Sequence, residues 1–381
     1  MPTSDGDPRP LDSSPVAADP RISLKAELDG ADPLRAPIAN DGATLTYDAT
    51  ESPVGHRHPE EDTATTAPAP RPPQLPTPRR GPDRVFRGLA SGAGFLIVAM
   101  IAAIAIFLLM QAIPSLAKNE ANFLTSNEWT VADNRLAFGI AGMLWTTSIS
   151  SIIAMLLAVP IAVGVALLIT HYSSRRVGNT VGFLVDLLAA VPSVVYGLWG
   201  ARVLGPALAP FTGWIQDNLG WFPLFSRGLS STGTVFIASL VLAIMILPIV
   251  TSISRDVFRQ TPRDHIEAAY ALGSTKWEMI KTAVLPYGRS GVIAASMLGL
   301  GRALGETIAV MLILSTTNDT KIDFSLFAGG QTFAAKIANN AAEFDSATKT
   351  GAYIAAGLVL FILTFVVNAL ARMIADRGKA K

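Results

Sequence analysis

The amino-acid sequence predicts an all-α membrane protein, and its composition and the clustering of its apolar residues support that prediction. Half of the 381 residues are apolar, and only 15% are charged, well below the roughly 25% of an ordinary soluble domain. The apolar residues gather in long uncharged or nearly uncharged stretches. The formal net charge of +1 gives no field that would attract phosphate backbones, so a strongly basic nucleic-acid binder is excluded.

Residues 1–83 differ in composition from the rest of the chain. They contain 16 of the 25 prolines and 14 acidic residues against 8 basic ones. Such a segment cannot bury enough apolar surface to offset its chain entropy, so we predict a disordered, Pro-rich cytoplasmic tail. No apolar core of a signal peptide lies near Met1. Composition does not separate a merely solvated tail from a regulatory or docking segment.

Six apolar stretches follow the tail, and each is long enough to be a membrane-spanning helix. A helix needs about 20 apolar residues to cross roughly 30 Å of hydrocarbon, and helices satisfy their own backbone groups where lipid offers no partner. We expect the first helix and an outer loop within residues 84–138 and the remaining five helices within residues 139–376. The six stretches are 89–113, 136–169, 181–200, 228–254, 290–317 and 351–370.

The distribution of basic residues predicts the orientation of these spans. One set of alternate connections holds 16 Lys and Arg, and the opposite set holds 7. Cytoplasmic loops carry the excess of positive charge. We therefore expect a multi-pass membrane protein with six spans and both termini in the cytoplasm; the resemblance described below implies that the membrane is the bacterial cell membrane.

The connection at residues 255–289, between the fourth and fifth spans, is long for a helix bundle. Its local signals predict two short helices that form an elbow. Gly273 is a stop signal for the first helix, and Thr275 with Glu278 has the spacing of a capping box for the second. Pro286 is predicted to end the second helix, because the residue before a proline avoids the α region.

The fifth span contains two charged residues, Arg302 and Glu306, which would be neighbours on one helix face. An ionised side chain at bilayer depth is costly, so both should face a polar interior. The planar guanidinium suits an oxyanion, and Glu306 would hold it in place between passages. We predict that both line a substrate pathway. The alternative is a buried ion pair that only braces two helices.

The third span contributes three further candidates for the pathway: Asp186, Ser193 and Tyr196. Pro192 is expected to bend or loosen the helix beside them. Asp186 would pair with Arg302 or another cation, or it would extend to the cytoplasmic headgroups. For Ser193 and Tyr196, ordinary hydrogen bonds between helices are the alternative.

One motif in the cytoplasmic connection resembles a known family. Glu267, Ala268 and Ala269, followed after three residues by Gly273 and after nine more by residues 283–286 (AVLP), resemble the EAA loop in membrane subunits of bacterial ABC importers. Alanine stands where that pattern has isoleucine. The resemblance implies that these four residues dock the elbow onto a separate ATP-hydrolysing subunit. The alternative is an amphipathic helix that lies on the lipid surface.

Two membrane segments sharpen the resemblance. Residues 301–307 (GRALGET) and 189–200 (AAVPSVVYGLWG) resemble the PstC-type permeases of phosphate-specific (Pst) importers, over roughly residues 84–376. This implies the MetI-like fold of type I ABC importer permeases. It also implies inorganic phosphate as substrate, with a pathway that passes Arg302.

The resemblance further implies a heteromeric assembly. Its members would be a second, PstA-like permease, two PstB-like ATP-binding subunits and an extracytoplasmic PstS-like phosphate-binding protein, all in or beside membrane lipid. The sequence contains no G-x-x-x-x-G-K-[ST] phosphate loop. We therefore expect no enzymatic activity and no cofactor in this chain, with ATP and Mg²⁺ bound by the partners. With no Cys and four His, no metal site is expected.

Other transport functions stay open at this level. A permease of an ABC importer for sulfate or molybdate is the nearest alternative. An ion-coupled secondary transporter is a second one, although the carboxylates in matched repeats that such folds use are not evident. A non-transporting scaffold leaves an arginine at bilayer depth unexplained.

Overall fold

The computed structural model describes residues 80–132, 135–226, 228, 232–316 and 322–377. The chain divides into two units, Met1–Thr77 and Pro78–Lys381, and the description that follows concerns the second. The tail predicted at residues 1–83 lies outside the described residues, except for its last four, which begin the first helix.

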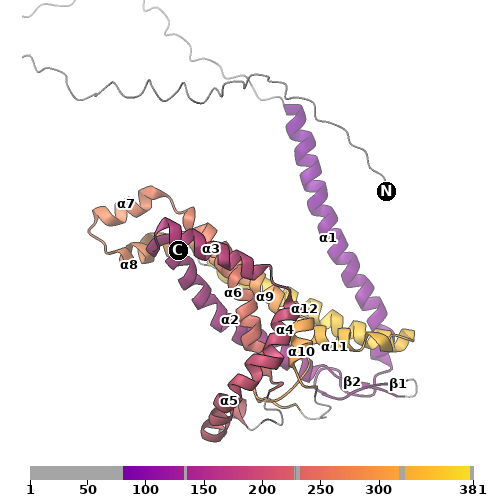
Figure 1. The fold of residues 1–381 in the computed structure, drawn as a ribbon. Coiled ribbons are helices and arrows are strands. Elements are labelled where there is room, and N and C mark those ends of the chain that lie inside the picture. Colours follow the sequence, from indigo (N-terminus) through magenta and orange to yellow (C-terminus); the bar gives the residue numbers. More distant parts are fainter. Residues whose placement is uncertain (1–79, 133–134, 227, 229–231, 317–321, 378–381) are drawn as a thin grey trace, which may run out of the picture. The chain divides into compact units, whose positions relative to one another are not determined.

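The described chain is built mainly of helices (Figure 1). The α-helices are α1 (Arg80–Ala117), α2 (Ala141–Leu167), α3 (Arg175–Ala189), α4 (Ser193–Trp199), α5 (Gly205–Leu219), α6 (Val235–Arg259), α7 (Arg263–Ala271), α8 (Lys276–Met279), α9 (Leu285–Gly305), α10 (Ile308–Ile313), α11 (Phe333–Asn339) and α12 (Ala347–Arg377). Three π turns continue them: η1 (Leu168–Tyr172), η2 (Gly200–Leu204) and η4 (Ile280–Val284). Short 3₁₀ turns are η3 (Pro223–Phe225) and η5 (Ala341–Glu343).

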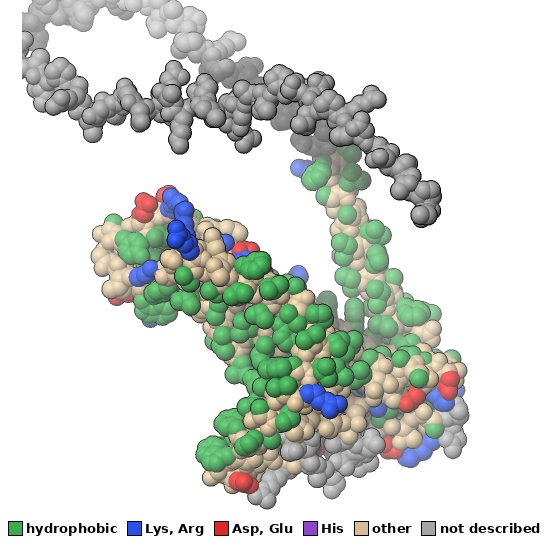
Figure 2. All heavy atoms as spheres, in the orientation of Figure 1, with side chains coloured by type: hydrophobic (Ala, Val, Ile, Leu, Met, Phe, Trp, Pro, Cys, Tyr) green, Lys and Arg blue, Asp and Glu red, His purple; other side chains and the backbone are tan. Residues whose placement is uncertain are grey.

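Within the residues that the structure describes, four helices are long and apolar enough to cross a membrane: α1, α2 with η1, α6 and α12. A fifth span exists if α3 and the helix that follows it count as one bent pair. The expectation of six spans is therefore not reproduced by length and composition. Figure 2 shows apolar side chains over the middle of this face and along α1, with most of the charged side chains near α7–α8 and near the β-hairpin.

The second apolar stretch, residues 136–169, is longer than a bilayer requires, and its first residues lie outside the helix. Residues 136–138 belong to strand β2 (Arg135–Phe138), which pairs antiparallel with β1 (Trp129–Ala132), and α2 begins only at Ala141. Phe138 is fully buried in a cluster with residues of α1 and α12. A short apolar run does not distinguish a strand from a helix, so the hairpin was invisible in the hydropathy pattern.

The third and fifth predicted spans are both interrupted. The chain turns by 88° between α3 and the helix that begins at Ser193, where Pro192 supplies no backbone donor and keeps Val191 out of the α region. The expected bend is confirmed, and the stretch over residues 181–200 belongs to one span only if the two bent halves are counted together. The fifth stretch breaks after Gly305, because Glu306 has an extended backbone with ψ at 127°.

Helix α6 is the centre of the packing, and it is the most buried of the four candidate spans. Ala154, Ala158 and Ala162 of α2 are fully buried and recur every four residues, so they form one stripe along which α2 approaches its neighbours closely. A Cβ on Gly299 of α9 would lie 3.0 Å from Val250 of α6. Small residues thus bring α2, α6 and α9 together.

Helix α1 contacts α12. The Ser115 hydroxyl donates a hydrogen bond of 2.7 Å to the Thr348 carbonyl, and a Cβ on Gly351 would overlap Ser115. These two helices also enclose part of the cluster around Phe138.

Helices α7 and α8 form an elbow (residues 263–279) at one end of the bundle (Figure 1). Gly273 has a φ of 78°, which favours glycine, and the capping box of Thr275 with Glu278 is present. Both predictions are confirmed. The predicted helix end at Pro286 is wrong, because α8 continues through η4 into α9. The π turn replaces the i→i−4 pattern just before the proline, whose missing donor falls in the first turn of α9.

Candidate functional site

The two interrupted helices meet at their breaks. Helix α4 begins directly after the bend at residues 190–192, and α10 begins directly after the break at residues 306–307. A Cβ on Gly197 would lie 2.6 Å from the Cα of Ala309. A Cβ on Gly200 would lie 3.0 Å from the Cδ1 of Ile313. Because glycine occupies both positions, α4 with η2 lies in direct contact with the short helix α10.

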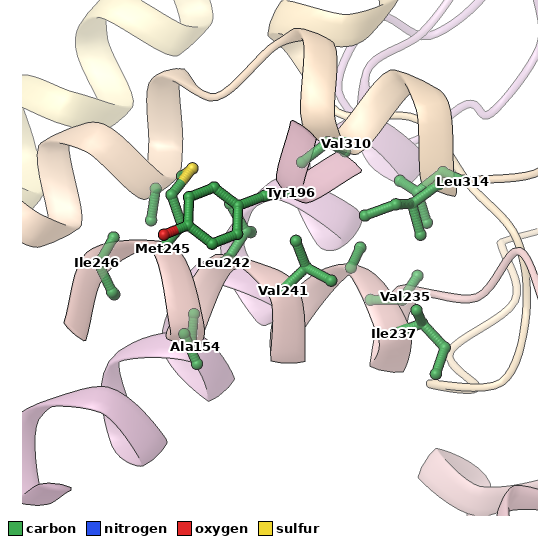
Figure 3. Packing of buried hydrophobic residues seen from close by; sticks show 14 of the residues in the cluster. Ala154, Tyr196, Val235, Ile237, Val241, Leu242, Met245, Ile246, Val310 and Leu314 are labelled. Carbon is green, nitrogen blue, oxygen red and sulfur yellow. The ribbon is translucent and has the colours of Figure 1, made fainter. Parts of the chain in front are cut away.

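Tyr196 is buried at this contact. Its hydroxyl donates a hydrogen bond of 2.9 Å to the carbonyl of Leu188 in the last turn of α3. This bond bridges the bend and satisfies a carbonyl that the interrupted helix leaves without its usual donor. Figure 3 shows the Tyr196 ring above α6, near Leu242 and Met245. Within the described residues the Tyr196 hydroxyl is hydrogen-bonded to Leu188 and not to Arg302.

Arg302 lies in the last turn of α9 and is half-buried. Its Nε atom is buried and has no hydrogen-bond partner among the described residues. A Cβ placed on Gly301 or on Gly305 would have no atom within 4 Å, so the turn that carries the guanidinium borders open space. The carbonyl end of a helix favours a cation. Arg302 is thus a cation with unused donor capacity beside an open face.

Glu306 is buried, and its carboxylate has a structural partner. Its Oε1 accepts a hydrogen bond of 3.1 Å from the backbone N–H of Ala309, in the first turn of α10. The expected ion pair with Arg302 is absent among the described residues, because α9 ends at Gly305 and the helical i, i+4 relation is lost. The hypothesis that Glu306 holds the guanidinium is corrected. The roles of both residues in a pathway stay predictions.

Asp186 does not pair with Arg302. Its Oδ2 lies 3.2 Å from Nη1 of Arg255 in α6, and its Oδ1 accepts a hydrogen bond of 2.9 Å from the Ser252 hydroxyl. A Cβ on Gly182 would lie 2.8 Å from the same Nη1 atom, so this glycine makes room for the guanidinium. Asp186 joins α3 to α6, and Arg255 is a partner that sequence reasoning missed because only the folded chain brings the two helices together.

Ser193 is half-buried at the first position of α4. Its side chain donates or accepts no hydrogen bond within the described part of the chain. It stands next to the bend, where we predicted a pathway residue, but the structure gives it no contact that tests this role.

The elbow presents the four residues of the EAA motif on α7 and the turn that follows it. Glu267, Ala268 and Gly273 are exposed, whereas Ala269 is buried against the protein. Leu272, at 87% exposure, extends the exposed surface with an apolar side chain. Sequence reasoning missed Leu272, although an apolar residue next to a helix-ending glycine was a visible signal.

The second helix of the elbow is stabilised electrostatically at its start. The backbone N–H and the hydroxyl of Thr275 both donate to Oε2 of Glu278, over 2.8 and 2.7 Å. These hydrogen bonds favour the ionised carboxylate, so they hold the pKa of Glu278 below its ordinary value. Within the described residues, no group of three or more acidic or histidine side chains is placed to hold a metal ion.

Solved structures of transporters resemble this fold. The inward-facing MetNI methionine ABC transporter is 16% identical with a TM-score of 0.42, over 63% of this chain and 95% of that chain. A bacterial ABC transporter for alginate is 15% identical with a TM-score of 0.47, over 78% of this chain and 98% of that chain.

Curated relatives are much more similar in sequence. The chain is 57% identical over 302 residues to the phosphate transport system permease protein PstC 2 of Mycobacterium tuberculosis, covering 78% of this chain and 93% of the relative. It is 55% identical over 296 residues to PstC of Mycobacterium leprae, covering 77% and 92%. It is 39% identical over 307 residues to PstC of Xylella fastidiosa, covering 78% and 92%.

A family model covers the part of the chain that contains the elbow and both helix breaks. Residues 158–379 match the binding-protein-dependent transport system inner membrane component. Together with the several apolar helices, this match makes the chain a multi-pass inner-membrane protein. The chain therefore belongs to the family of binding-protein-dependent transport system inner membrane components, among the PstC permeases.

Proposed function

We propose that this chain is a membrane-spanning permease subunit of an ATP-driven importer of inorganic phosphate. The names of its PstC relatives support the substrate. The single observation on which the proposal depends is Arg302, which has a buried Nε without a partner among the described residues, next to open space at a helix break. An arginine held in this way can donate two parallel hydrogen bonds to a phosphate oxyanion.

The two helix breaks supply the moving parts. A discontinuous helix can change its direction at the break while each half stays rigid. Phosphate that arrives from the outer side passes Arg302, and Tyr196 lines the pathway at the bend, where its hydroxyl already donates a hydrogen bond to the carbonyl of Leu188. Asp186 acts through Arg255 to hold α3 on α6, so it positions the pathway rather than lining it.

The energy comes from partner subunits. The elbow, with Glu267, Ala268, Ala269 and Gly273, docks onto an ATP-binding subunit of the PstB type, which holds ATP and Mg²⁺. This chain itself binds no cofactor and catalyses no reaction. The assembly contains a PstA-like second permease, two ATP-binding subunits and a PstS-like phosphate-binding protein on the outer side. Both termini lie in the cytoplasm, as the excess of basic residues on one set of connections predicts.

Phosphate uptake by variants of Arg302 tests this proposal. Arg302→Gln, in the complete importer, should assemble normally and reduce radiolabelled phosphate uptake at least tenfold, because the cation and its paired donors are lost. Arg302→Lys should restore only part of the uptake, since an ammonium keeps the charge without the fork. Arg202→Gln, which changes an exposed arginine of η2, is the matched control. Normal uptake by Arg302→Gln would overturn the proposal, and equal transport of sulfate by the unchanged protein would reassign the substrate.

A further inference from the structure

A groove on the surface between α2 and α9 is not explained by transport or by the elbow. Two adjoining cavities of about 470 and 490 Å³ form it, and both are lined by Val163 and Leu285. Each volume falls within the range of small-molecule sites, roughly 300–1,000 Å³. We call the two cavities together the α2–α9 groove.

The walls of the α2–α9 groove are apolar and accessible. Leu168, Tyr172 and Trp277 line one end of it, and each of these side chains is about half exposed. Gly164 also lines that end, and no atom lies within 4 Å of the position of a Cβ on it. The groove is therefore open at Gly164 and is shaped for an apolar chain.

Basic side chains edge the same groove. Trp277, Lys281, Leu285 and Arg289 recur every four residues along α8, η4 and α9, so they follow one side of this continuous helix. The Lys281 ammonium lies 5.3 Å from the centre of the Trp277 ring. Arg289 lines the cavity, is exposed, and forms no ion pair with any residue that the structure describes.

A third cation stands at the opposite wall. The Lys276 ammonium lies 4.9 Å from the centre of the Tyr172 ring, which ends the π turn that continues α2. Each aromatic ring at this end of the groove thus carries an ammonium. The lining is apolar and its edge is cationic, which is the complement of a lipid with an anionic headgroup.

The depth of the groove matches a membrane surface. The helix over Ala141–Tyr172 has 32 residues, which is about 48 Å at 1.5 Å per residue. A bilayer with its headgroups is about 40–45 Å thick, so the Tyr172 end lies at the level of the headgroups. Tyrosine and tryptophan favour this level, and the flexible stems of Lys276 and Lys281 let their ammonium groups reach the headgroups.

We propose that the α2–α9 groove binds an anionic phospholipid. One acyl chain lies in the groove along Val163, Gly164 and Leu285, and the headgroup phosphate is bound by Lys276 and Lys281 at the Tyr172 end of the groove. Because Trp277 and Lys276 belong to α8, the bound lipid links the elbow to the membrane surface. The site is independent of the substrate that the permease carries.

Fluorescence quenching of Trp277 by brominated lipids tests the site. The full-length chain is reconstituted in dioleoylphosphatidylcholine vesicles that contain dibrominated phosphatidylglycerol or, at equal mole fraction, dibrominated phosphatidylcholine. The difference in quenching between the unchanged chain and Trp277→Phe isolates the signal of Trp277. We expect this signal to be quenched at least threefold more strongly by the anionic lipid.

Two variants separate the headgroup from the acyl chain. Lys276→Gln combined with Lys281→Gln should reduce the quenching by phosphatidylglycerol to the level of phosphatidylcholine, whereas Arg372→Gln, which changes an exposed arginine of α12, should leave it unchanged. In Gly164→Leu no atom lies within 4 Å of the new Cβ and leucine favours the helix, so the variant should narrow the groove and remove the quenching by both lipids while the circular dichroism spectrum stays the same.

Three results would overturn the proposal. Equal quenching by the two brominated lipids would show that no anionic headgroup is selected. Unchanged quenching in Gly164→Leu would show that the acyl chain lies elsewhere. Loss of the Trp277 signal when the chain is assembled with its partner subunits would assign the groove to a protein interface.

Discussion

The contact between α4 and α10 depends on one residue, Gly197. A Cβ there would lie 2.6 Å from the Cα of Ala309 and 3.0 Å from its carbonyl oxygen. Both are backbone atoms, which cannot move aside as a side-chain end can. The contact holds α4 against α10, so a single methyl group at this position would force the two helices apart.

We predict that Gly197→Val destabilises the protein and stops transport. Overpacking of a close contact costs about 1–3 kcal/mol, and a β-branched side chain adds to it. The expected result is a lower melting temperature in detergent, measured by the exposure of buried aromatic residues, together with loss of uptake. Gly213→Val in α5 is the control, because no atom lies within 4 Å of its Cβ position. A similar loss in both variants would contradict the prediction.

At the scale of the element, the start of α8 is the part of the elbow whose stability responds to pH. The two hydrogen bonds from Thr275 require an ionised Glu278, and they lower its pKa in the folded state. A carboxylate with a lowered folded pKa contributes stability that is fully present above the unfolded pKa. That contribution is lost as the pH falls through the folded pKa.

We therefore predict that the first turn of α8 frays below the ordinary glutamate pKa of about 4.3. Amide hydrogen exchange of residues 276–279, corrected for the intrinsic rate at each pH, should accelerate as the pH falls through that range. Glu278→Gln keeps a capping side chain but does not titrate, so its exchange should show no such step. A step of equal size in that variant would assign the effect to another group.

The elements that the sequence predicted correctly are those with a local cause. The capping box at Thr275 and the turn at Gly273 depend on neighbours in the chain, so they are visible in the sequence and are confirmed. Pro286 shows the limit of a local rule, because a π turn upstream changes the register that the rule assumes. The apolar run at residues 136–138 forms a strand of a hairpin rather than part of a helix. No local pattern shows this, because Phe138 is buried by contacts with α1 and α12.

The candidate site was predictable in its residue types and not in its pairings. Arg302 and Tyr196 were identified from charge and polarity within apolar stretches, and the structure places Arg302 in the last turn of α9 and Tyr196 next to the bend after α3. The partner of Asp186 is Arg255, 69 positions away in the chain, and no local pattern links the two. Glu306 does not pair with Arg302 because α9 ends at Gly305, so the i, i+4 relation between the two residues is lost. The amino-acid composition of this stretch does not reveal that break.

At the scale of the whole molecule, the elbow is the exposed segment through which a partner would act. The positive φ of Gly273 sets the angle between α7 and α8, and Leu272 next to it is almost fully exposed. The surface offered to a partner therefore depends on a backbone conformation that costs most residues about 1–2 kcal/mol.

We predict that Gly273→Val prevents assembly with the ATP-binding subunit, whereas Gly273→Asn retains it. Valine is a poor fit for a left-handed conformation, and asparagine tolerates it. Co-purification of the ATP-binding subunit with a tagged permease measures the outcome. Arg302→Gln should co-purify normally, which separates a docking defect from a transport defect. Full assembly of Gly273→Val would mean that the elbow angle has no part in docking.

The uninterrupted helix from Lys276 to Gly305 has a mechanical consequence. Residues 276–305 form a rod of about 45 Å at 1.5 Å per residue, with the elbow at one end and the guanidinium of Arg302 in its final turn. A rotation of the elbow therefore turns the whole helix about its axis and moves Arg302 directly. No rearrangement of side chains between the two ends is needed. The helix break at residues 306–307 lies just beyond Arg302. Because the chain can bend at this break, α10 can keep its contact with Gly197 while Arg302 moves with α9.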